Sequence, residues 1–225
     1  MPPVPIPFPL SSAPGASTQE SAGRLINCYA EPLGKDILAK KGMTPPVVVW
    51  RKSPGLSLFG ASTNTGFRGA IKIDNIIYAA WSGKASRFDS SGAEITLTGT
   101  LNGTEKVFWA RNNKSTPDVV CCAPQTGLFQ ASTSAVTSLS AWGAPNSIAF
   151  MDSYLLATYG DGTIQASDQN AVTLNTLNKT TAQSKPGGLL RGVPFNGQYI
   201  ALGPAFGEVY TDTANATGFP FTRSY

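Results

Sequence analysis

The sequence contains no histidine among its 225 residues. This absence excludes Ser-His and Cys-His catalytic pairs, imidazole metal ligands and His-Glu-x-x-His metalloprotease chemistry. The Gly-x-x-x-x-Gly-Lys-Ser/Thr phosphate loop is also missing, and no Gly-x-Gly-x-x-Gly follows a predicted strand. We therefore expect no cofactor and no metal ion, and we predict that the protein is not an enzyme.

Paired carboxylates are the catalytic option that remains, because a glycosidase needs only two of them. The candidates are Asp89, Glu94, Asp118, Asp152, Asp161, Asp168, Glu208 and Asp212. Most of them lie in predicted turns, where aspartate is favoured because its side chain bonds nearby backbone amides. A glycosidase is thus a third hypothesis, which no feature of the sequence favours.

Charged residues are scarce, at 13% of the chain, about half the usual share of roughly 25%. The net charge is +4, but the only tight basic pairs are Lys40-Lys41 and Arg51-Lys52. Because no helix or ribbon with a basic face is predicted, we expect no sequence-specific binding of DNA. A polar surface with little charge is common on proteins that pack against copies of themselves, and it also suits a secreted β-domain.

Cysteine is rare, and its three positions are Cys28, Cys121 and Cys122. An odd number without regular spacing is not a disulfide framework. Adjacent residues of a strand point to opposite faces, so Cys121 and Cys122 are expected to be small apolar fillers in a reducing compartment. No apolar run of about 20 residues predicts a membrane span, and the proline-rich start does not resemble a signal peptide. We therefore expect the protein to be made in a cytoplasm.

Residues 1–23 form an arm rich in Pro, Ser, Gly and Ala. Alternating prolines near its start favour an extended backbone. Four apolar side chains alternate with these prolines: Val4, Ile6, Phe8 and Leu10. These residues are predicted to contact a neighbouring subunit, and simple disorder of the arm is the alternative.

Residues 24–225 are predicted to form an all-β domain of short strands joined by turns. Strands are expected at residues 47–50, 71–73, 76–79, 119–122, 147–150, 154–157 and 199–202. Turn dipeptides separate them: Asp74-Asn75, Asp152-Ser153, Asp161-Gly162 and Asn196-Gly197. Helix signals are almost absent, and residues 33–42 are either one helical turn or a loop.

The strands recur in a repeated order of strand, Asp or Asn turn, apolar strand, Gly turn and strand. This unit covers residues 69–88, 147–167 and 190–211, and its last part returns at residues 127–132. Its turn glycines, Gly83, Gly127, Gly162 and Gly207, are spaced by 44, 35 and 45 residues, close to the roughly 40–50 residues of a propeller blade. We predict about four blade-like units of a β-propeller. Further residues or another chain would complete the ring if four blades do not close it.

The four tryptophans recur at similar intervals, at Trp50, Trp81, Trp109 and Trp142. They are either stacking platforms for sugars or bases or apolar anchors between blades. We favour the anchors, since each blade of a propeller buries its faces against its neighbours.

Several motifs resemble a known family in their order along the chain. Residues 21–32 are similar to the Arg-x-x-Asn-x-Tyr-x-Glu start of several phage tail proteins, and residues 50–56 resemble the Pro-Gly segment that follows it. Trp142-Gly143, residues 152–155 and 161–168, 182–186, Asn196-Gly197, 208–210 and 217–221 continue this order. Over most of residues 20–225 the chain resembles the packaged-DNA stabilisation proteins, the tail hub or nozzle of short-tailed phages.

The resemblance implies a virion tail protein, assembled in the host cytoplasm as a ring of six copies below the portal and adaptor proteins. Such a ring prolongs the channel, retains packaged double-stranded DNA, lets it pass without reading its sequence, and carries needle, fibre or spike proteins. Family members are considerably longer than this chain. The alternative is a carbohydrate- or receptor-binding propeller, which would expose Trp and Tyr beside Asp or Asn at the blade ends.

Overall fold

The computed structural model describes residues 28–32, 48–52, 57–185, 187–215 and 217–224. It divides the chain into two units, Met1–Leu58 and Phe59–Tyr225. In the described part of the first unit, β1 (Cys28–Pro32) pairs antiparallel with β2 (Val48–Lys52). β2 confirms the strand predicted near residues 47–50. The arm at residues 1–23, its boundary with the next domain and the turn or loop at 33–42 lie outside the described residues.

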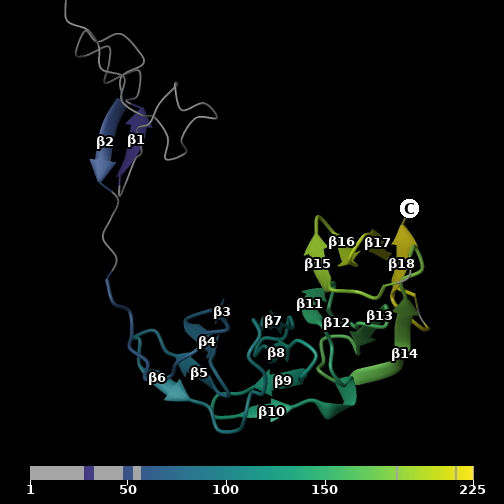
Figure 1. Cartoon of the computed structure of the whole chain (residues 1–225), viewed down its shortest axis with the longest axis horizontal. Helices are drawn as coiled ribbons and strands as arrows, with labels where there is room; N and C mark the ends of the chain where they lie inside the picture. The colour runs from purple at the N-terminus through teal and green to yellow at the C-terminus, as the bar shows by residue number, and fades with distance from the viewer. Residues whose placement is uncertain (1–27, 33–47, 53–56, 186, 216, 225) are drawn as a thin grey trace, which may run out of the picture. The chain divides into compact units, whose positions relative to one another are not determined.

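The second unit contains four antiparallel sheets of four strands each, coloured blue to yellow in Figure 1. Blade 1 consists of β3 (Gly69–Ile73), β4 (Ile76–Ala80), β5 (Ala85–Phe88) and β6 (Glu94–Thr96). Blade 2 consists of β7 (Phe108–Arg111), β8 (Val119–Ala123), β9 (Gly127–Ala131) and β10 (Val136–Ser138). A 3-10 turn, η1 (Ser140–Trp142), follows blade 2.

Blade 3 consists of β11 (Ser147–Met151), β12 (Tyr154–Thr158), β13 (Thr163–Ser167) and β14 (Leu174–Thr181). Blade 4 consists of β15 (Arg191–Phe195), β16 (Gln198–Leu202), β17 (Gly207–Asp212) and β18 (Phe221–Ser224). In every sheet, strands that are consecutive in sequence are hydrogen-bonded neighbours, so each blade is a meander. The predicted all-β fold with four blade-like, propeller-type units is confirmed.

The turn signals of the repeat lie where the sequence predicted them. Asn196 and Gly197 have φ angles of +49° and +73° between β15 and β16, the pair of positive angles that a type I′ hairpin turn requires. Gly83 and Gly162, at φ +75° and +90°, come just before the third strands of blades 1 and 3. Gly127 and Gly207 are the first residues of the third strands of blades 2 and 4. The glycine spacing therefore reported the blade repeat correctly.

The blades stack through their innermost strands. β3 packs beside β7, β7 beside β11, and β11 beside β15, and Figure 1 shows the four sheets following one another with these strands on the inside. Three apolar clusters fill the three junctions between successive blades. β15 and β3 do not pack against each other in the way of the successive pairs. The second unit is thus a series of four stacked blades with two terminal faces.

The alternation of side chains along a central strand explains how one blade serves two junctions. In β8, Val119 and Cys121 enter the cluster against blade 1, whereas Val120 and Cys122 enter the cluster against blade 3. All five residues of β8 are buried. Cys121 and Cys122 are free thiols on opposite faces, as predicted, and burial raises the pKa of Cys122 to about 12.

Candidate functional site

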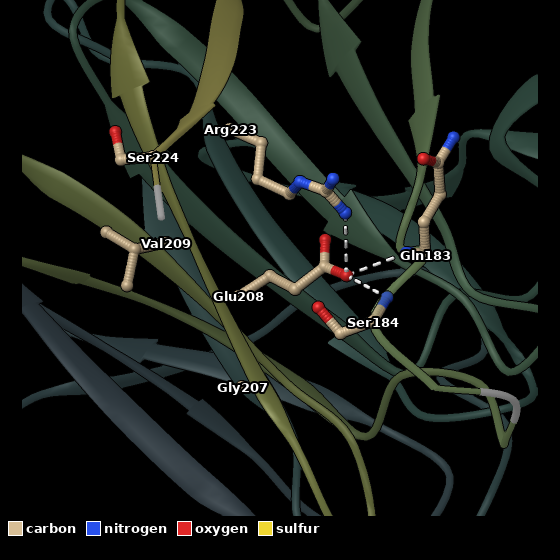
Figure 2. A pocket seen from close by; sticks show the side chains of 7 residues that line it. All are labelled: Gln183, Ser184, Gly207, Glu208, Val209, Arg223 and Ser224. Atoms are coloured by element: carbon tan, nitrogen blue, oxygen red, sulfur yellow. Dashed lines mark hydrogen bonds and ion pairs between the residues drawn. The ribbon is translucent and has the colours of Figure 1, made fainter.

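A hollow of about 460 Å³ lies at the end of blade 4, where β17 and β18 meet the segment between β14 and β15. Its walls come from Gln183, Ser184, Gly207, Glu208, Val209, Arg223 and Ser224. Figure 2 shows the Glu208 carboxylate between Arg223 and the backbone of residues 183–184. Glu208 is 3% exposed, so this carboxylate is the feature of the hollow that needs an explanation.

Three hydrogen bonds and one ion pair compensate the burial of Glu208. The backbone N–H groups of Gln183 and Ser184 donate to Oε1 at 2.7 and 2.5 Å. The Tyr210 hydroxyl donates to Oε2 at 2.5 Å, and Arg223 Nη1 lies 3.5 Å from Oε1. Burial by itself raises the pKa of Glu208, but the hydrogen bonds from Tyr210, Ser184 and Gln183 outweigh it and lower the pKa to about 2.

This cluster has a structural role, and we call such a buried charged side chain that binds the backbone between two blades a latch. The carboxylate fixes the backbone that leads out of blade 3 onto a strand of blade 4, and none of the other described residues that line the hollow carries a carboxylate side chain. A glycosidase would need two carboxyl groups facing one cleft. Sequence reasoning included Glu208 among the carboxylates but missed its role. The signal was available, because Glu208 and Tyr210 are two residues apart on one strand and therefore share a face.

The other carboxylate candidates are dispersed over the blades. Asp89, Asp161 and Asp212 accept hydrogen bonds from the backbone N–H groups of Ser91, Thr163 and Ala214, each two residues later. This is the turn geometry predicted for them. Asp152 has φ +46° in the turn between β11 and β12.

Three further carboxylates bind neighbouring polar side chains instead. Glu94 accepts from Ser62 and Asn64, Asp118 from Asn112 and Lys114, and Asp168 from Asn175. Among the described residues, no group of three or more Cys, Asp or Glu side chains is placed to hold a metal ion.

A second latch lies at the junction of blades 1 and 2, and it uses an arginine. Arg68 is 4% exposed. Its guanidinium donates to the backbone oxygens of Glu105, Leu101 and Asn102 at 2.8, 3.0 and 3.1 Å. It thereby fixes the segment that leads from β6 to β7. No sequence pattern indicated this contact, because the acceptors are backbone oxygens, which every residue type has.

Of the three tryptophan side chains that the structure describes, two are anchors between blades. Trp142 is buried at the junction of blades 2 and 3 and donates from Nε1 to the Val172 oxygen at 2.9 Å. Trp109 is half-buried and packs against the cluster between blades 1 and 2. Trp81 binds Ser86 and forms an edge contact with Phe67. Trp142 and Trp109 are therefore anchors between blades, while the Trp50 side chain lies outside the described residues.

A shallower hollow of about 280 Å³ crosses the inner strands β7, β11 and β15. Arg111 and Arg191 lie on its rim and are exposed, and its walls include Ile148, Phe150 and Val193. The Arg191 guanidinium carbon is 4.8 Å from the centre of the Phe108 ring. Two arginines beside apolar side chains are a combination with which proteins bind anionic groups, and the Phe108 ring contacts one of the two.

Val4, Ile6, Phe8 and Leu10, the predicted subunit contacts, lie outside the described residues, so that prediction stays untested. No helix in the described part of the chain is long and apolar enough to cross a membrane. The structure instead exposes large apolar side chains on blade 4, among them Phe195, Leu202 and Leu190, at 67%, 40% and 57% exposure.

No protein-family model and no curated protein matches this sequence. Solved structures do match it in fold. The computationally designed protein Ika4 has a TM-score of 0.51 and 14% identity, over 70% of this chain and 99% of Ika4. The WD40 domain of Pan2 from Neurospora crassa has a TM-score of 0.47 and 12% identity, over 70% of this chain and 52% of that domain. BamB from Moraxella catarrhalis has a TM-score of 0.39 and 17% identity, over 70% of this chain and 46% of BamB. At these identities the likeness concerns the fold alone, which is all-β and propeller-like.

Proposed function

We propose that this chain is a non-enzymatic structural subunit of a short-tailed phage tail, in the hub or nozzle that extends the DNA channel. In this role it assembles in the host cytoplasm into a ring, six copies by the family resemblance. The ring contacts the portal and adaptor proteins on one side and needle, fibre or spike proteins on the other. Double-stranded DNA is retained and later passes through the lumen without sequence-specific binding.

The observation that carries this proposal is the apolar face of blade 4 on which no other blade packs among the described residues. Val193, Ile200 and Val209 lie opposite one another across β15, β16 and β17 on this face, and Phe195 on the same sheet is 67% exposed. An apolar sheet face of this kind is typical of a surface that is covered in an assembly. A structural subunit keeps such a face permanently buried against its neighbour in the assembly.

The carbohydrate-binding alternative needs exposed aromatic rings beside Asp or Asn at the blade ends. The described tryptophans offer less for that purpose, because Trp142 is buried and Trp109 packs into a junction. The polar groups of the hollow at Glu208 also bind one another rather than pointing outward. The geometry therefore favours an assembly role over sugar recognition.

Immuno-electron microscopy tests the proposal. Antibodies raised against the full chain are expected to label the tail below the portal vertex of short-tailed particles in lysates of the host. A glycan array incubated with the purified chain serves as the contrasting measurement. Specific glycan binding together with unlabelled tails would contradict the hub role and favour the receptor-binding alternative.

A further inference from the structure

The face of blade 4 that points away from blade 3 resembles the faces through which the blades of this chain pack on one another. In blade 3, Ala149, Leu156 and Ala166 lie opposite one another across β11, β12 and β13. These three residues are 7%, 0% and 0% exposed and are buried against blade 4. In blade 4, Val193, Ile200 and Val209 occupy the equivalent positions and lie opposite one another across β15, β16 and β17.

The equivalence of these two rows of residues indicates what kind of partner covers the outward face of blade 4. The residues of blade 4 that point to blade 3, such as Tyr199 and Tyr210, are buried in the apolar cluster between these two blades. Because side chains alternate along a strand, the row through Ile200 points the other way. At three junctions of this chain the partner of such a row is the next blade. The partner that fits here is therefore another propeller blade.

Within the described part of the second unit, blade 1 also has a face on which no further blade packs, the one opposite blade 2. Ile71 and Tyr78 point to blade 2, so the neighbouring row of Lys72, Ile77 and Phe88 points away from it. A hollow of about 330 Å³ on this side is lined by Phe59, Lys72, Asn75, Ile77 and Ser90. Phe59 is 51% exposed. An aromatic ring projecting from blade 4, such as Phe195, meets the apolar side chains of Phe59 and Ile77 in this hollow, beside the polar side chains of Lys72, Asn75 and Ser90.

We propose that blade 4 of one copy stacks on blade 1 of a second copy, and blade 4 of the second copy on blade 1 of the first. The inference deepens the proposed structural function and rests on it, since it names the first partner of the uncovered face. A head-to-tail contact either closes or continues indefinitely. Two copies close at eight blades, the upper end of the typical range of about four to eight. Six copies would enter a tail ring as three such pairs.

The mass of the purified full chain in solution is the first test. Light scattering after size exclusion is expected to give twice the 23.6 kDa of one chain. Phe195→Asp should raise the dissociation constant of the pair by about 30-fold or more, because it places a charge in a desolvated contact. Leu177→Asp is the matched control, since Leu177 is 76% exposed on β14, away from both terminal faces. Circular dichroism should show that both variants remain folded.

A mixing experiment tests the head-to-tail arrangement. Phe59→Asp changes the blade 1 side without touching a strand, and alone it should also separate the pair. Mixing it with Phe195→Asp should restore pairing, because the mixed pair contains one interface with both native faces. A face-to-face contact between two copies of blade 4 predicts instead that Phe59→Asp has no effect, and that result would overturn the arrangement.

The outcomes separate this inference from the hub proposal. A chain that stays monomeric at tens of micromolar, or pairs that Phe195→Asp leaves as stable as Leu177→Asp does, would overturn the inference. Tails labelled by the antibody would still support the hub in that case. Pairs that respond to both variants, combined with unlabelled tails, would support the inference and contradict the hub.

Discussion

Blades 3 and 4 each present a row of apolar side chains at equivalent positions of the sheet, on the face that points away from the preceding blade. The two rows differ in whether another blade covers them. Leu156 in the middle of blade 3 is fully buried, while Ile200 at the equivalent position of blade 4 is only half-buried. Both are large aliphatic residues in the centre of a sheet face. The repeated sequence pattern therefore gives each blade an apolar face for stacking. Whether the side chains of that face are buried depends on whether another blade follows. The predictions below use this difference, and they run from the largest expected effect to the smallest.

Leu156→Ala should lower the free energy of unfolding by about 3 kcal/mol, because it removes a buried aliphatic side chain and leaves a cavity. Ile200→Ala should cost less than about 1 kcal/mol at low protein concentration, where the face is uncovered. Urea unfolding of both variants measures the difference. Equal losses at that concentration would mean that both faces are covered within a single chain.

Arg68→Met tests the junction of blades 1 and 2. The substitution leaves the oxygens of Leu101, Asn102 and Glu105 without their donor, which should cost about 2–3 kcal/mol of unfolding free energy. The matched control is Lys106→Met, an exposed residue of the same connection, which should change stability by less than about 0.5 kcal/mol. Similar stabilities of the two variants would show that the Arg68 latch contributes nothing.

Glu208→Gln tests the latch at blade 4 through its pH dependence. Because the folded pKa of about 2 is below the ordinary value of 4.5, the ionised carboxylate stabilises the fold fully above pH 4.5 and loses this effect as the pH falls toward 2. Removing it should cost about 2 kcal/mol at neutral pH. The difference from the unsubstituted protein should shrink progressively in urea titrations at pH 4 and pH 3.

The exposed Asp74 in the turn between β3 and β4 provides the control for that titration. Asp74→Asn should change the stability by less than about 0.5 kcal/mol, because asparagine also tolerates the φ of +52° at this position. A stability difference for Glu208→Gln that stays constant from pH 7 to pH 3 would contradict the assignment of the low pKa to Glu208.

The smallest effect concerns reactivity rather than stability. Cys121 and Cys122 are buried at two different junctions, and burial raises the pKa of both thiols. In a Cys28→Ser background, a thiol reagent should therefore react only at the rate of unfolding, and both cysteines together. Rapid labelling of Cys122 alone in native buffer would show that the junction of blades 2 and 3 opens separately.

The sequence predicted the blades well because local signals specify them. The turn residues Asn196-Gly197 and the apolar run at 119–122 each act over a few neighbours, and both lie where they were expected. The latches of Arg68 and Glu208 could not be predicted with the same ease. Arg68 binds backbone oxygens 33 to 37 residues away, and Glu208 binds amides 24 and 25 residues away. Such contacts depend on how blades are placed beside one another, which a single sequence does not encode locally.

The sequence also could not predict that the apolar face of blade 4 has no neighbouring blade among the described residues. The alternation at residues 198–202 marks Ile200 and Leu202 as one face of a strand, and equally apolar faces are buried elsewhere in the chain. Only the structure distinguishes a row with a neighbouring blade from a row without one.

The central claim is that the apolar face of blade 4 is covered in the working protein, and side-chain footprinting tests it most directly. Carbene labelling of the native assembled protein compares Phe195 with Leu177, which are 67% and 76% exposed in the single chain. The account predicts that Leu177 is labelled and that Phe195 is protected until the assembly is dissociated by dilution. Equal labelling of both residues in the native particle would contradict it.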